Sequence, residues 1–553
     1  MNWAKAYLEA IRSGQEVVSL KVRKVYEREC AWMDDPNFEF RFDEEKGNRP
    51  IEFIERFCRH YEGEWAGKKI ELELFQKAKI QLVFGWVDDN GFRRFREVID
   101  VRGRKCGKST ETAAVELYCL VADGEGGAQV CCTANKKDQA SIIFKSAVAM
   151  RQQSKELRLI TRKRQSDIYM PSTMSTLVAL AADSKTMDGL NAHFFSQDEW
   201  HEAKTRKIYD VMKQSQSARR QPLAWLISTN GFLREAFFDD RYDYASKVAM
   251  WEKGFHDLRV LPLIYELDHR DEWMDEKCWA KANPGLGKIK SIESLRQWVD
   301  AAKRDPTALP TLLTKDFNIA ENSSESWLPF DACVNEKVVG MDYLRKSYAI
   351  GGCDLSSTTD LTCATLLIVK PETDELFVLQ KYFLPEMRVN AVEANSAREA
   401  PYRIWAKNEW LHICDGASVD YRAVTQWFVD MVEIHDIRPL WVCYDRALAG
   451  YWVEEMQSYG FDMEKIAQGP FTWTYPMKRL GAMLSEHKIV SENNPMLRWC
   501  LTNTAQKTTN KDGIQSIQPV KTSANKRIDG MVSLLNAFVG YCNHEEEIRK
   551  FAR

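Results

Sequence analysis

The segment GRKCGKST, residues 103–110, comes close to the phosphate-binding loop that precedes a helix in many nucleotide-binding proteins. That pattern would place its first glycine at position 102, where this chain has Arg102. Gly107, Lys108 and Ser109 still supply a backbone that can approach a phosphate, an ammonium group and a hydroxyl for Mg²⁺. REVIDV before the loop predicts a strand, and STETAAVELYCLVA after it predicts a helix whose N-terminus faces an anion. The alternative is a basic surface turn before a helix, so the decision rests on the rest of the chain.

Composition and length describe an ordinary globular protein with more than one core. The 553 residues suggest about three to four domain-sized units, or two large ones. A net charge of -3 argues against a uniformly basic nucleic-acid coat, although TRKRQ (161–165), SARRQ (217–221) and NKRID (525–529) could form a local basic track or simply be solvated faces. Since no apolar run approaches the length of a membrane span and the N-terminus does not resemble a signal peptide, we expect a cytoplasmic protein without a membrane partner. The 14 cysteines are scattered without a CxxC pair, which indicates reduced core residues.

Further along, two segments end in polar residues that suit ATP hydrolysis. NAHFFSQDEW (191–200) is an apolar stretch that ends in Asp198 and Glu199, which would bind the metal and polarise the attacking water. AQVCCTAN (128–135) is an intervening strand, and PLAWLISTNG (222–231) ends in Ser228, Thr229 and Asn230, which could sense the γ-phosphate or form a simple turn. Upstream, Gln76 lies on a predicted helix and could read the adenine edge, although a surface glutamine is the default interpretation.

The loop Arg104-Lys105-Cys106-Gly107-Lys108-Ser109, followed by Asp198-Glu199 and Ser228-Thr229-Asn230, resembles the large terminase subunit of tailed bacteriophages. WAKANPGLG (279–287) also resembles a recurring segment of that family, and the resemblance extends from about residue 50 to about residue 540. It implies that Arg104 acts in cis on the γ-phosphate and that Gln76 belongs to an adenine-binding motif. The implied ATP-binding residues are Gln76, Arg104, Lys105, Cys106, Gly107, Lys108, Ser109, Thr110, Asp198, Thr229 and Asn230, with Mg²⁺ held by Ser109 and Asp198.

The resemblance also implies an RNase H-like nuclease, which the second half of the chain allows us to check independently. A predicted strand reaches Asp354, a meander follows, a buried strand ends at Asp445, and Asp529 lies in the first turn of a last helix. Three carboxylates on such elements suit a two-metal phosphodiesterase that uses Mg²⁺ or Mn²⁺, although each alone could be a turn, strand-end or helix-start residue. Asp360 and Asp415 are the substitutes if one choice is wrong. Lys521, Lys526 and Arg527 could contact DNA phosphates.

We therefore predict an α/β chain with a P-loop ATPase domain of the ASCE type at 1–265, a lid segment at 266–326 and an RNase H-like nuclease domain at 327–553. The polar run AENSSES (320–326) is the best single boundary. The resemblance implies translocation of double-stranded viral DNA into a procapsid and cleavage of concatemers. It also implies a ring of copies on the portal, a small terminase subunit as partner, and work in the cytoplasm of an infected bacterium and transiently on the procapsid portal, without retention in the mature virion.

Two alternatives remain open at this point. A cellular ATPase-nuclease of repair or defence would need further helicase motifs between Asn230 and the nuclease, and none is clear. A packaging motor with an inactive nuclease is disfavoured by the intact Asp354, Asp445 and Asp529. An arginine from a neighbouring copy could complete the ATP site, and the candidates are Arg162, Arg164, Arg219 and Arg220.

Overall fold

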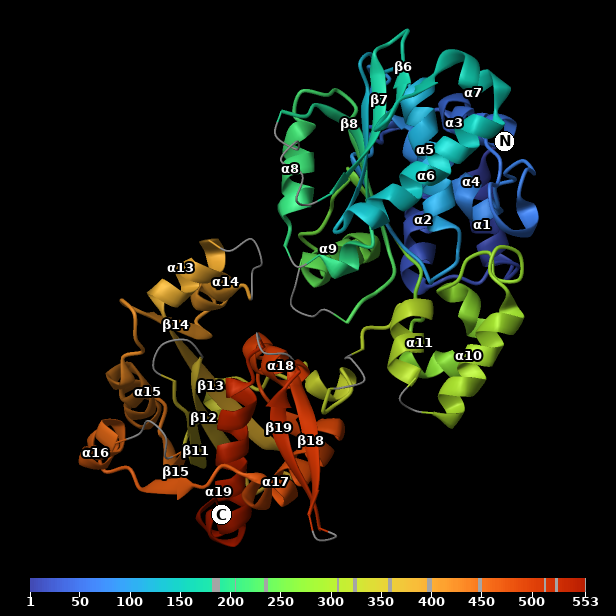
Figure 1. Ribbon diagram of the computed structural model, residues 1–553. Helices are drawn as coiled ribbons and strands as arrows, with labels where there is room; N and C mark the ends of the chain where they lie inside the picture. Colours follow the sequence, from blue (N-terminus) through green and yellow to red (C-terminus); the bar gives the residue numbers. More distant parts are fainter. Residues whose placement is uncertain are drawn as a thin grey trace. The chain divides into compact units, whose positions relative to one another are not determined.

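The computed structural model divides the chain into two compact units, Met1–Ala320 and Glu321–Arg553, which we call the first and second units (Figure 1). The described residues are 1–181, 189–203, 205–232, 237–305, 308–321, 326–356, 361–394, 400–445, 450–511, 514–522 and 526–552.

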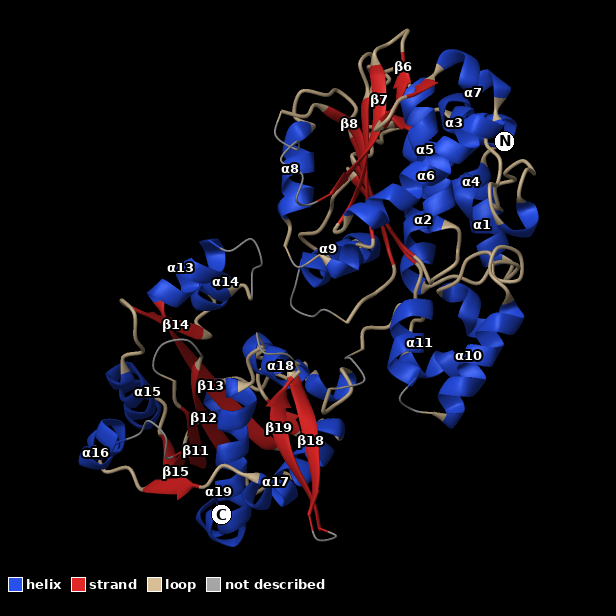
Figure 2. Cartoon of the chain, in the orientation of Figure 1, coloured by secondary structure: helices blue, strands red, loops and turns tan. Residues whose placement is uncertain are grey.

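A mixed sheet of eight strands, which we call the first sheet, forms the centre of the first unit (Figure 2). Its order is β10 (Val260–Ile264), β3 (Glu97–Val101), β9 (Leu223–Ser228), β8 (Ala192–Asp198), β4 (Gln129–Ala134), β7 (Ser175–Ala181), β6 (Asp167–Met170) and β5 (Arg162–Lys163). The first six strands are parallel, and β6 and β5 continue antiparallel. Every residue of β3, β8, β9 and β10 is buried, as expected for parallel strands covered on both faces. Because β9 separates β3 from β8, the predicted ASCE order is confirmed.

Helices cover both faces of the first sheet. One face packs against α1 (Trp3–Arg12), α2 (Leu20–Met33), α3 (Glu44–Phe57), α4 (Leu74–Gly85), α5 (Lys108–Val121), α6 (Lys137–Gln153) and α7 (Lys155–Ile160). The other face packs against α8 (Lys207–Ser215) and α9 (Phe237–Met250) (Figure 1). A short antiparallel pair of strands, β1 (Arg41–Phe42) and β2 (Trp86–Val87), completes this part. Because β3, β9 and β8 are parallel, their carboxyl ends share one edge of the sheet, which we call the first carboxyl edge.

The described part of the lid segment has a small core of its own. It contains α10 (Ile292–Arg304), α11 (Leu309–Asp316) and the 3₁₀ helices η3 (Arg270–Met274) and η4 (Glu276–Lys281). Its buried cluster includes Trp273, Trp279, Leu295, Leu313 and Phe317. The residues up to Ala320 still belong to the same compact unit as the first sheet, so the lid as a separate subdomain stays a prediction.

A seven-stranded sheet, which we call the second sheet, forms the centre of the second unit. Its order is β14 (Leu411–Cys414), β13 (Leu376–Pro385), β12 (Thr362–Val369), β11 (Ser347–Asp354), β15 (Ile437–Asp445) and β16 (Met463–Ile466), and β17 (Ile489–Val490) pairs with β13. Strands β11, β12 and β13 form an antiparallel meander, and β15 lies parallel to β11. This is the predicted RNase H-like arrangement.

The helices of the second unit surround this sheet, and α19 crosses its centre (Figure 1). They are α12 (Met341–Leu344), α13 (Glu386–Ala394), α14 (Tyr402–Lys407), α15 (Tyr421–Glu433), α16 (Gly450–Ser458), α17 (Pro470–Ser485), α18 (Pro495–Thr502) and α19 (Asp529–Ala552). A separate hairpin consists of β18 (Thr504–Lys511) and β19 (Ile514–Lys521).

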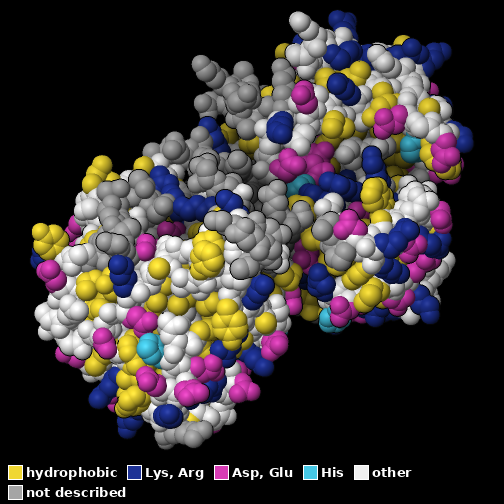
Figure 3. All heavy atoms as spheres, turned by 60° about the horizontal axis from the view of Figure 1, so that its bottom comes forward, with side chains coloured by type: hydrophobic (Ala, Val, Ile, Leu, Met, Phe, Trp, Pro, Cys, Tyr) yellow, Lys and Arg dark blue, Asp and Glu magenta, His cyan; other side chains and the backbone are white. Residues whose placement is uncertain are grey.

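Side-chain distribution agrees with the composition. The cysteines are core residues as predicted, since all but Cys278 and Cys542 are buried. On the face shown in Figure 3, Lys and Arg side chains are interspersed with Asp and Glu side chains. Among the described helices, we find none with the length and apolar character that a bilayer span requires.

Candidate active sites

The predicted phosphate loop connects β3 to α5 at the first carboxyl edge. Gly107 precedes the helix with a φ of 75°, a left-handed conformation that glycine adopts at little cost. Lys108 is buried, and its Nζ donates hydrogen bonds to the main-chain oxygens of Arg102, at 2.6 Å, and Gly103, at 3.0 Å. Burial lowers the pKa of the Lys108 ammonium. The ammonium therefore lies within the loop, where an incoming phosphate group would compete for it.

Arg102, at the place of the missing glycine, lies beneath the loop. Its guanidinium is fully buried, donates to the main-chain oxygen of Cys106 at 3.2 Å, and pairs with Asp100 at 2.8 Å and Glu111 at 3.0 Å. Lys79 of α4 also pairs with Asp100, at 2.5 Å. Burial opposes ionisation of Asp100, but Arg102 and Lys79 lower its pKa overall. The Arg102 guanidinium thus links the loop to Asp100 of β3 and Glu111 of α5. Sequence reasoning missed this structural role of Arg102. The charged Asp100 inside an apolar strand was the signal that could have indicated it.

Gln76 lies beside the loop and is buried, so its interpretation as a surface residue was wrong. Its Oε1 accepts from the Glu73 amide at 3.0 Å, and its Nε2 donates to Glu111 at 3.0 Å. A Cβ added to Gly107 would lie 3.9 Å from this Nε2. The position is close enough to the loop for contact with a nucleotide, and the adenine role stays a prediction.

The outer part of the loop contacts the lid segment. Arg104 and Lys105 are exposed, and the Arg104 amide donates to the main-chain oxygen of Lys315 at 2.9 Å. A Cβ on Gly103 would lie 2.2 Å from Oδ1 of Asn283, within the WAKANPGLG segment. Gly103 is therefore required for this close approach. Cys106 is buried, and its Sγ lies 3.7 Å from the same Asn283 oxygen.

The acidic pair follows β8 on the same edge. Asp198 is almost fully buried, its Oδ1 accepts from the Glu199 amide at 2.8 Å, and its carboxyl group interacts with the Ser109 hydroxyl. Burial and the neighbouring Glu199 raise the pKa of Asp198 to about 7. The structure therefore brings together Ser109 and Asp198, two hard oxygen donors that suit Mg²⁺.

Glu199 points toward His201, a residue that sequence reasoning did not identify. Its backbone is left-handed, with a φ of 48° and a ψ of 41°, and its Oε2 lies 2.9 Å from His201 Nδ1. Burial alone would raise its pKa, but the neighbouring His201 ring and the Lys108 ammonium lower it to about 2. Glu199 is therefore ionised, as a residue that polarises water must be.

The residues after β9 complete the first carboxyl edge. Ser228 Oγ lies 2.8 Å from His201 Nδ1, and Thr229 and Asn230 are buried next to it. The Asn230 amide donates to Asn318 Oδ1, and its Nδ2 donates to the Asn318 main-chain oxygen, both at 2.9 Å. The strand end is thus tied to the end of the lid segment.

The structure separates the four candidate arginines. The Arg219 guanidinium donates to main-chain oxygens of Gly126, Gly127 and Asn191 and pairs with Glu125, so it has a structural role. Arg164 pairs with Asp167. Arg162 and Arg220 are exposed.

In the second unit, two predicted aspartates end neighbouring parallel strands. Cys353 of β11 is in register with Tyr444 of β15, so Asp354 and Asp445 follow at the same level. Asp529 is the first residue of α19, which is fixed across β11 because Ser533 Oγ donates to the Gly352 oxygen at 3.1 Å and Asn536 Nδ2 donates to the Cys353 oxygen at 3.0 Å. The three elements therefore meet at one edge of the second sheet.

The donor chemistry of this edge suits a divalent cation, since carboxylates are hard ligands. Within the residues that the structure describes, no three acidic, histidine or cysteine side chains are gathered closely enough to hold an ion. Asp360 lies outside the described residues. Asp415 is exposed after β14, which β13 and β12 separate from β11, so its choice as a substitute was wrong. Arg527 is buried, whereas Lys521 and Lys526 are partly exposed.

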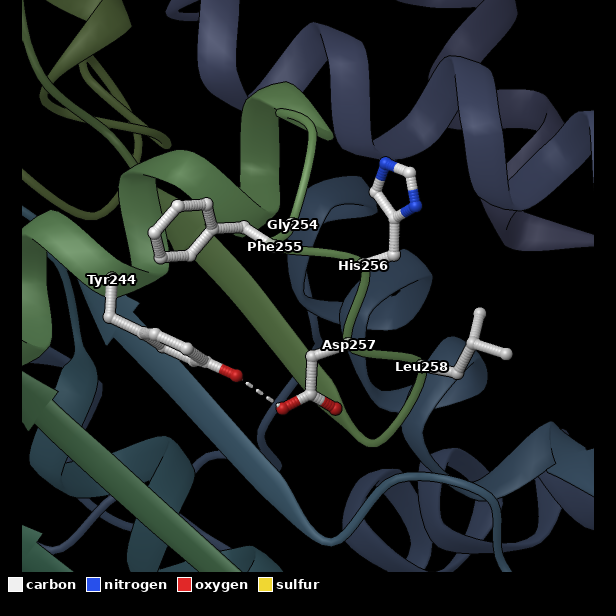
Figure 4. Close-up of a pocket in the computed structure, with 6 residues that line it drawn as sticks. All are labelled: Tyr244, Gly254, Phe255, His256, Asp257 and Leu258. Carbon is white, nitrogen blue, oxygen red and sulfur yellow. Dashed lines mark hydrogen bonds between the residues drawn. The ribbon is translucent and has the colours of Figure 1, made fainter.

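A separate hollow of about 290 Å³ lies in the first unit (Figure 4). It is lined by Tyr244, Gly254, Phe255, His256, Asp257 and Leu258, and the Tyr244 hydroxyl donates to Asp257 at 2.6 Å. None of these six lining residues belongs to the predicted sites.

Comparison with known proteins agrees with this geometry. The family model "Terminase large subunit, ATPase domain" matches residues 74–247, and "Terminase large subunit, endonuclease domain" matches residues 257–545, more than half of the chain. The terminase large subunit of Enterobacteria phage HK97 is 26% identical over 514 residues, which cover 90% of this chain and 96% of that protein. Protein YmfN of Escherichia coli (strain K12) is 26% identical over 370 residues, which cover 65% of this chain and 80% of that protein.

Among solved structures, the crystal structure of the HK97 bacteriophage large terminase covers 90% of this chain and 99% of its own, with 23% identity and a TM-score of 0.46. Both family models describe parts of one kind of protein, and they match in the order in which the two folds occur here. The chain belongs to the terminase large subunit family and has the ATPase and endonuclease activities of DNA packaging and cleavage.

Proposed function

We propose that Lys108, Ser109, Asp198 and Glu199 form the ATP-hydrolysing centre at the first carboxyl edge. The observation that supports this most directly is the interaction between the Ser109 hydroxyl and the Asp198 carboxyl group, which brings the loop and the end of β8 together. Ser109 and Asp198 would hold Mg²⁺, Lys108 would bind the β- and γ-phosphates, and Glu199 would polarise the attacking water. The Mg²⁺ ion, when bound, neutralises charge on the phosphates.

The remaining residues of the site would orient the nucleotide. The backbone of Lys105, Cys106, Gly107 and Thr110 would surround the phosphates at the N-terminus of α5. Arg104, which is exposed, would act in cis on the γ-phosphate. Gln76 would contact adenine, and Thr229 and Asn230 would sense the γ-phosphate. A trans arginine, if used, would be Arg162 or Arg220, because Arg219 and Arg164 are already paired.

At the second site, Asp354, Asp445 and Asp529 would hold two Mg²⁺ or Mn²⁺ ions. The support is the register of β11 with β15 and the attachment of α19 to β11. The ions, when bound, stabilise the attacking and leaving oxygens of the phosphodiester. The three carboxylates would orient the ions, and Lys521 and Lys526 would contact DNA phosphates without reading sequence.

Assembly follows from family membership as a proposal. We infer that copies form a ring on the portal of a procapsid, with double-stranded viral DNA and a small terminase subunit as partners. Relatives from phages HK97 and p2 support a viral role in the cytoplasm of an infected bacterium. The division into 1–265, 266–326 and 327–553 is supported by the separate core cluster between Leu267 and Phe317.

The experiment is a reciprocal test with the full chain. Lys108→Ala should lower the rate of ATP hydrolysis by about a thousandfold or more and leave Mn²⁺-dependent plasmid cleavage intact. Asp445→Ala should do the reverse. Matched controls are Lys253→Ala, an exposed lysine after α9, and Asp415→Ala, both expected to behave like the wild type. Normal hydrolysis by Lys108→Ala would refute the first assignment, and normal cleavage by Asp445→Ala would refute the second.

A further inference from the structure

Lys315 of α11 contacts three parts of the first carboxyl edge. Its main-chain oxygen accepts from the Arg104 amide at 2.9 Å. Its Nζ donates to the Asn230 main-chain oxygen at 3.2 Å and lies 2.5 Å from Nε2 of His201. The residue is 8% exposed. One buried lysine from the lid segment therefore touches the phosphate loop, the turn after β8 and the end of β9.

His201 lies between this lysine and Glu199. Its Nε2 faces Lys315, and its Nδ1 lies 2.9 Å from Glu199 Oε2. An ammonium group can only donate, so the contact requires Nε2 to be an acceptor and places the ring proton on Nδ1. That proton then meets Ser228 Oγ, 2.8 Å from Nδ1, and the Glu199 carboxylate lies beside the same N–H group. The ring is also held sterically, because a Cβ on Gly231 would lie 2.6 Å from its Cδ2.

We propose that His201 and Lys315 are positioning residues for Glu199: Lys315 sets the tautomer of His201, and the Nδ1–H group, held by Ser228 Oγ, keeps its positive end 2.9 Å from the Glu199 carboxylate. This rests on the proposed role of Glu199 and adds that part of its support comes from α11, outside the first sheet. Because α11 also contacts the loop through Arg104, a shift of α11 would change the loop and the orientation of Glu199 together. ATP hydrolysis would then depend on the position of the lid segment.

The surroundings of Lys315 predict a pH dependence that tests the same chain of contacts. The charged groups that face it are Glu199, Glu202, Arg104 and Lys108, besides the His201 ring. Burial lowers the pKa of Lys315 to about 8. The wild-type kcat should therefore fall as the pH rises through this value, because a neutral amine no longer sets the tautomer. Arginine at this position stays charged, so Lys315→Arg should move the fall to higher pH.

The experiment measures ATP hydrolysis and the affinity for a fluorescent ATP analogue in the full chain. Lys315→Met should lower kcat by about 10- to 100-fold while KM and the affinity change by less than about threefold. His201→Asn keeps a donor at the Nδ1 position and loses Nε2, so its kcat should fall to an intermediate value. The double variant should be no slower than Lys315→Met, since both changes break one chain of contacts. The matched control is Lys303→Met, a lysine on α10 whose side chain is 47% exposed.

Two outcomes would overturn the inference. One is a kcat for Lys315→Met within about twofold of the wild type. The other is a parallel loss of kcat and nucleotide affinity that Lys315→Arg does not restore, which would indicate a structural role. If Lys315→Met shows no cooperative unfolding transition, the variant is not properly folded. In that case His201→Asn and the pH profile of Lys315→Arg decide the question. Glu199→Gln, assayed in parallel, distinguishes failure of the proposed function from failure of this inference. Normal hydrolysis by Glu199→Gln refutes the proposed role of Glu199. An inactive Glu199→Gln together with a normal Lys315→Met refutes only the positioning role of Lys315.

Discussion

The active edges of the two sheets are held together by different forces. At the first carboxyl edge, buried charges and hydrogen bonds fix the loop, with Arg102 paired to Asp100 and Glu111. At the edge of the second sheet, close packing fixes α19: a Cβ on Gly352 would lie 2.3 Å from the Ser533 oxygen, and one on Gly540 would lie 2.4 Å from Cys443 Sγ. An edge held by charges can respond to a charged ligand, because the ligand interacts electrostatically with the same buried groups. An edge held by shape supplies a backbone frame whose geometry depends on small residues.

The largest effect that tests this difference comes from restoring the missing glycine. Arg102→Gly matches the usual loop pattern, yet it removes the guanidinium from Asp100 and Glu111 and leaves the two carboxylates paired with Lys79. Removing one side of such a buried ion network costs about 4 kcal/mol of unfolding free energy. Urea unfolding of the full chain, followed by nucleotide-analogue binding, measures this loss in the first unit.

A matched control for Arg102→Gly lies in the same loop. Lys105 has a φ of 63°, so Lys105→Gly removes a left-handed non-glycine residue and should change the unfolding free energy by less than about 1 kcal/mol. If Arg102→Gly unfolds at the same urea concentration as the wild type, charge does not hold the loop, and the comparison fails.

The sequence supported the parts of both sites that depend on local pattern. Apolar segments that end in Asp198, Asp354 and Asp445 could be recognised because a strand and its last residue are adjacent in the chain. His201 and Lys315 could not be found in this way, since 114 positions separate the two and only the fold brings them together. Arg102 was noticed as a departure from a pattern. Its partner Glu111 lies in the first turn of α5, beyond the loop, and reaches Arg102 only in the folded chain.

A smaller effect tests the shape-held edge. Gly352→Ala places a methyl group against the Ser533 oxygen and, at 2.6 Å, the Ala537 amide nitrogen, both backbone atoms of α19 that cannot move alone. Overpacking of this kind costs about 3 kcal/mol and should displace Asp529, so plasmid cleavage should fall while ATP hydrolysis persists. Gly450→Ala is the control, because its added methyl would meet no atom of the described residues within 4 Å. Unchanged cleavage and stability of Gly352→Ala would show that the helix is not fixed by this contact.

The smallest effect concerns a buried acid next to the first carboxyl edge. Glu116 of α5 is fully buried and accepts from Cys132 Sγ at 2.9 Å and Ser196 Oγ at 2.6 Å. Burial raises its pKa from 4.5 to about 7, because desolvation outweighs the two hydrogen bonds. The folded chain therefore binds this proton more tightly than the unfolded chain does. The stability gained from it is fully present below about pH 4.5 and is lost as the pH rises through about 7.

Glu116→Gln keeps the shape and removes the titration, so it should leave the unfolding free energy nearly unchanged at pH 4.5 and raise it by about 2 kcal/mol at pH 8. Glu545 of α19 gives the contrast in the second unit: its hydrogen bond with Arg479 lowers its pKa to about 2, so its contribution is present above about pH 4.5 and is lost as the pH falls toward 2. Glu545→Gln should therefore destabilise the chain at pH 8, where Glu116→Gln stabilises it. Unfolding curves at the two pH values decide the matter, and equal signs for the two variants would mean that burial does not dominate at Glu116. Opposite signs would show that the first unit retains the buried acid Glu116 at a cost in stability at pH 8. Glu116 lies next to the first carboxyl edge, where Asp198 also has a raised pKa.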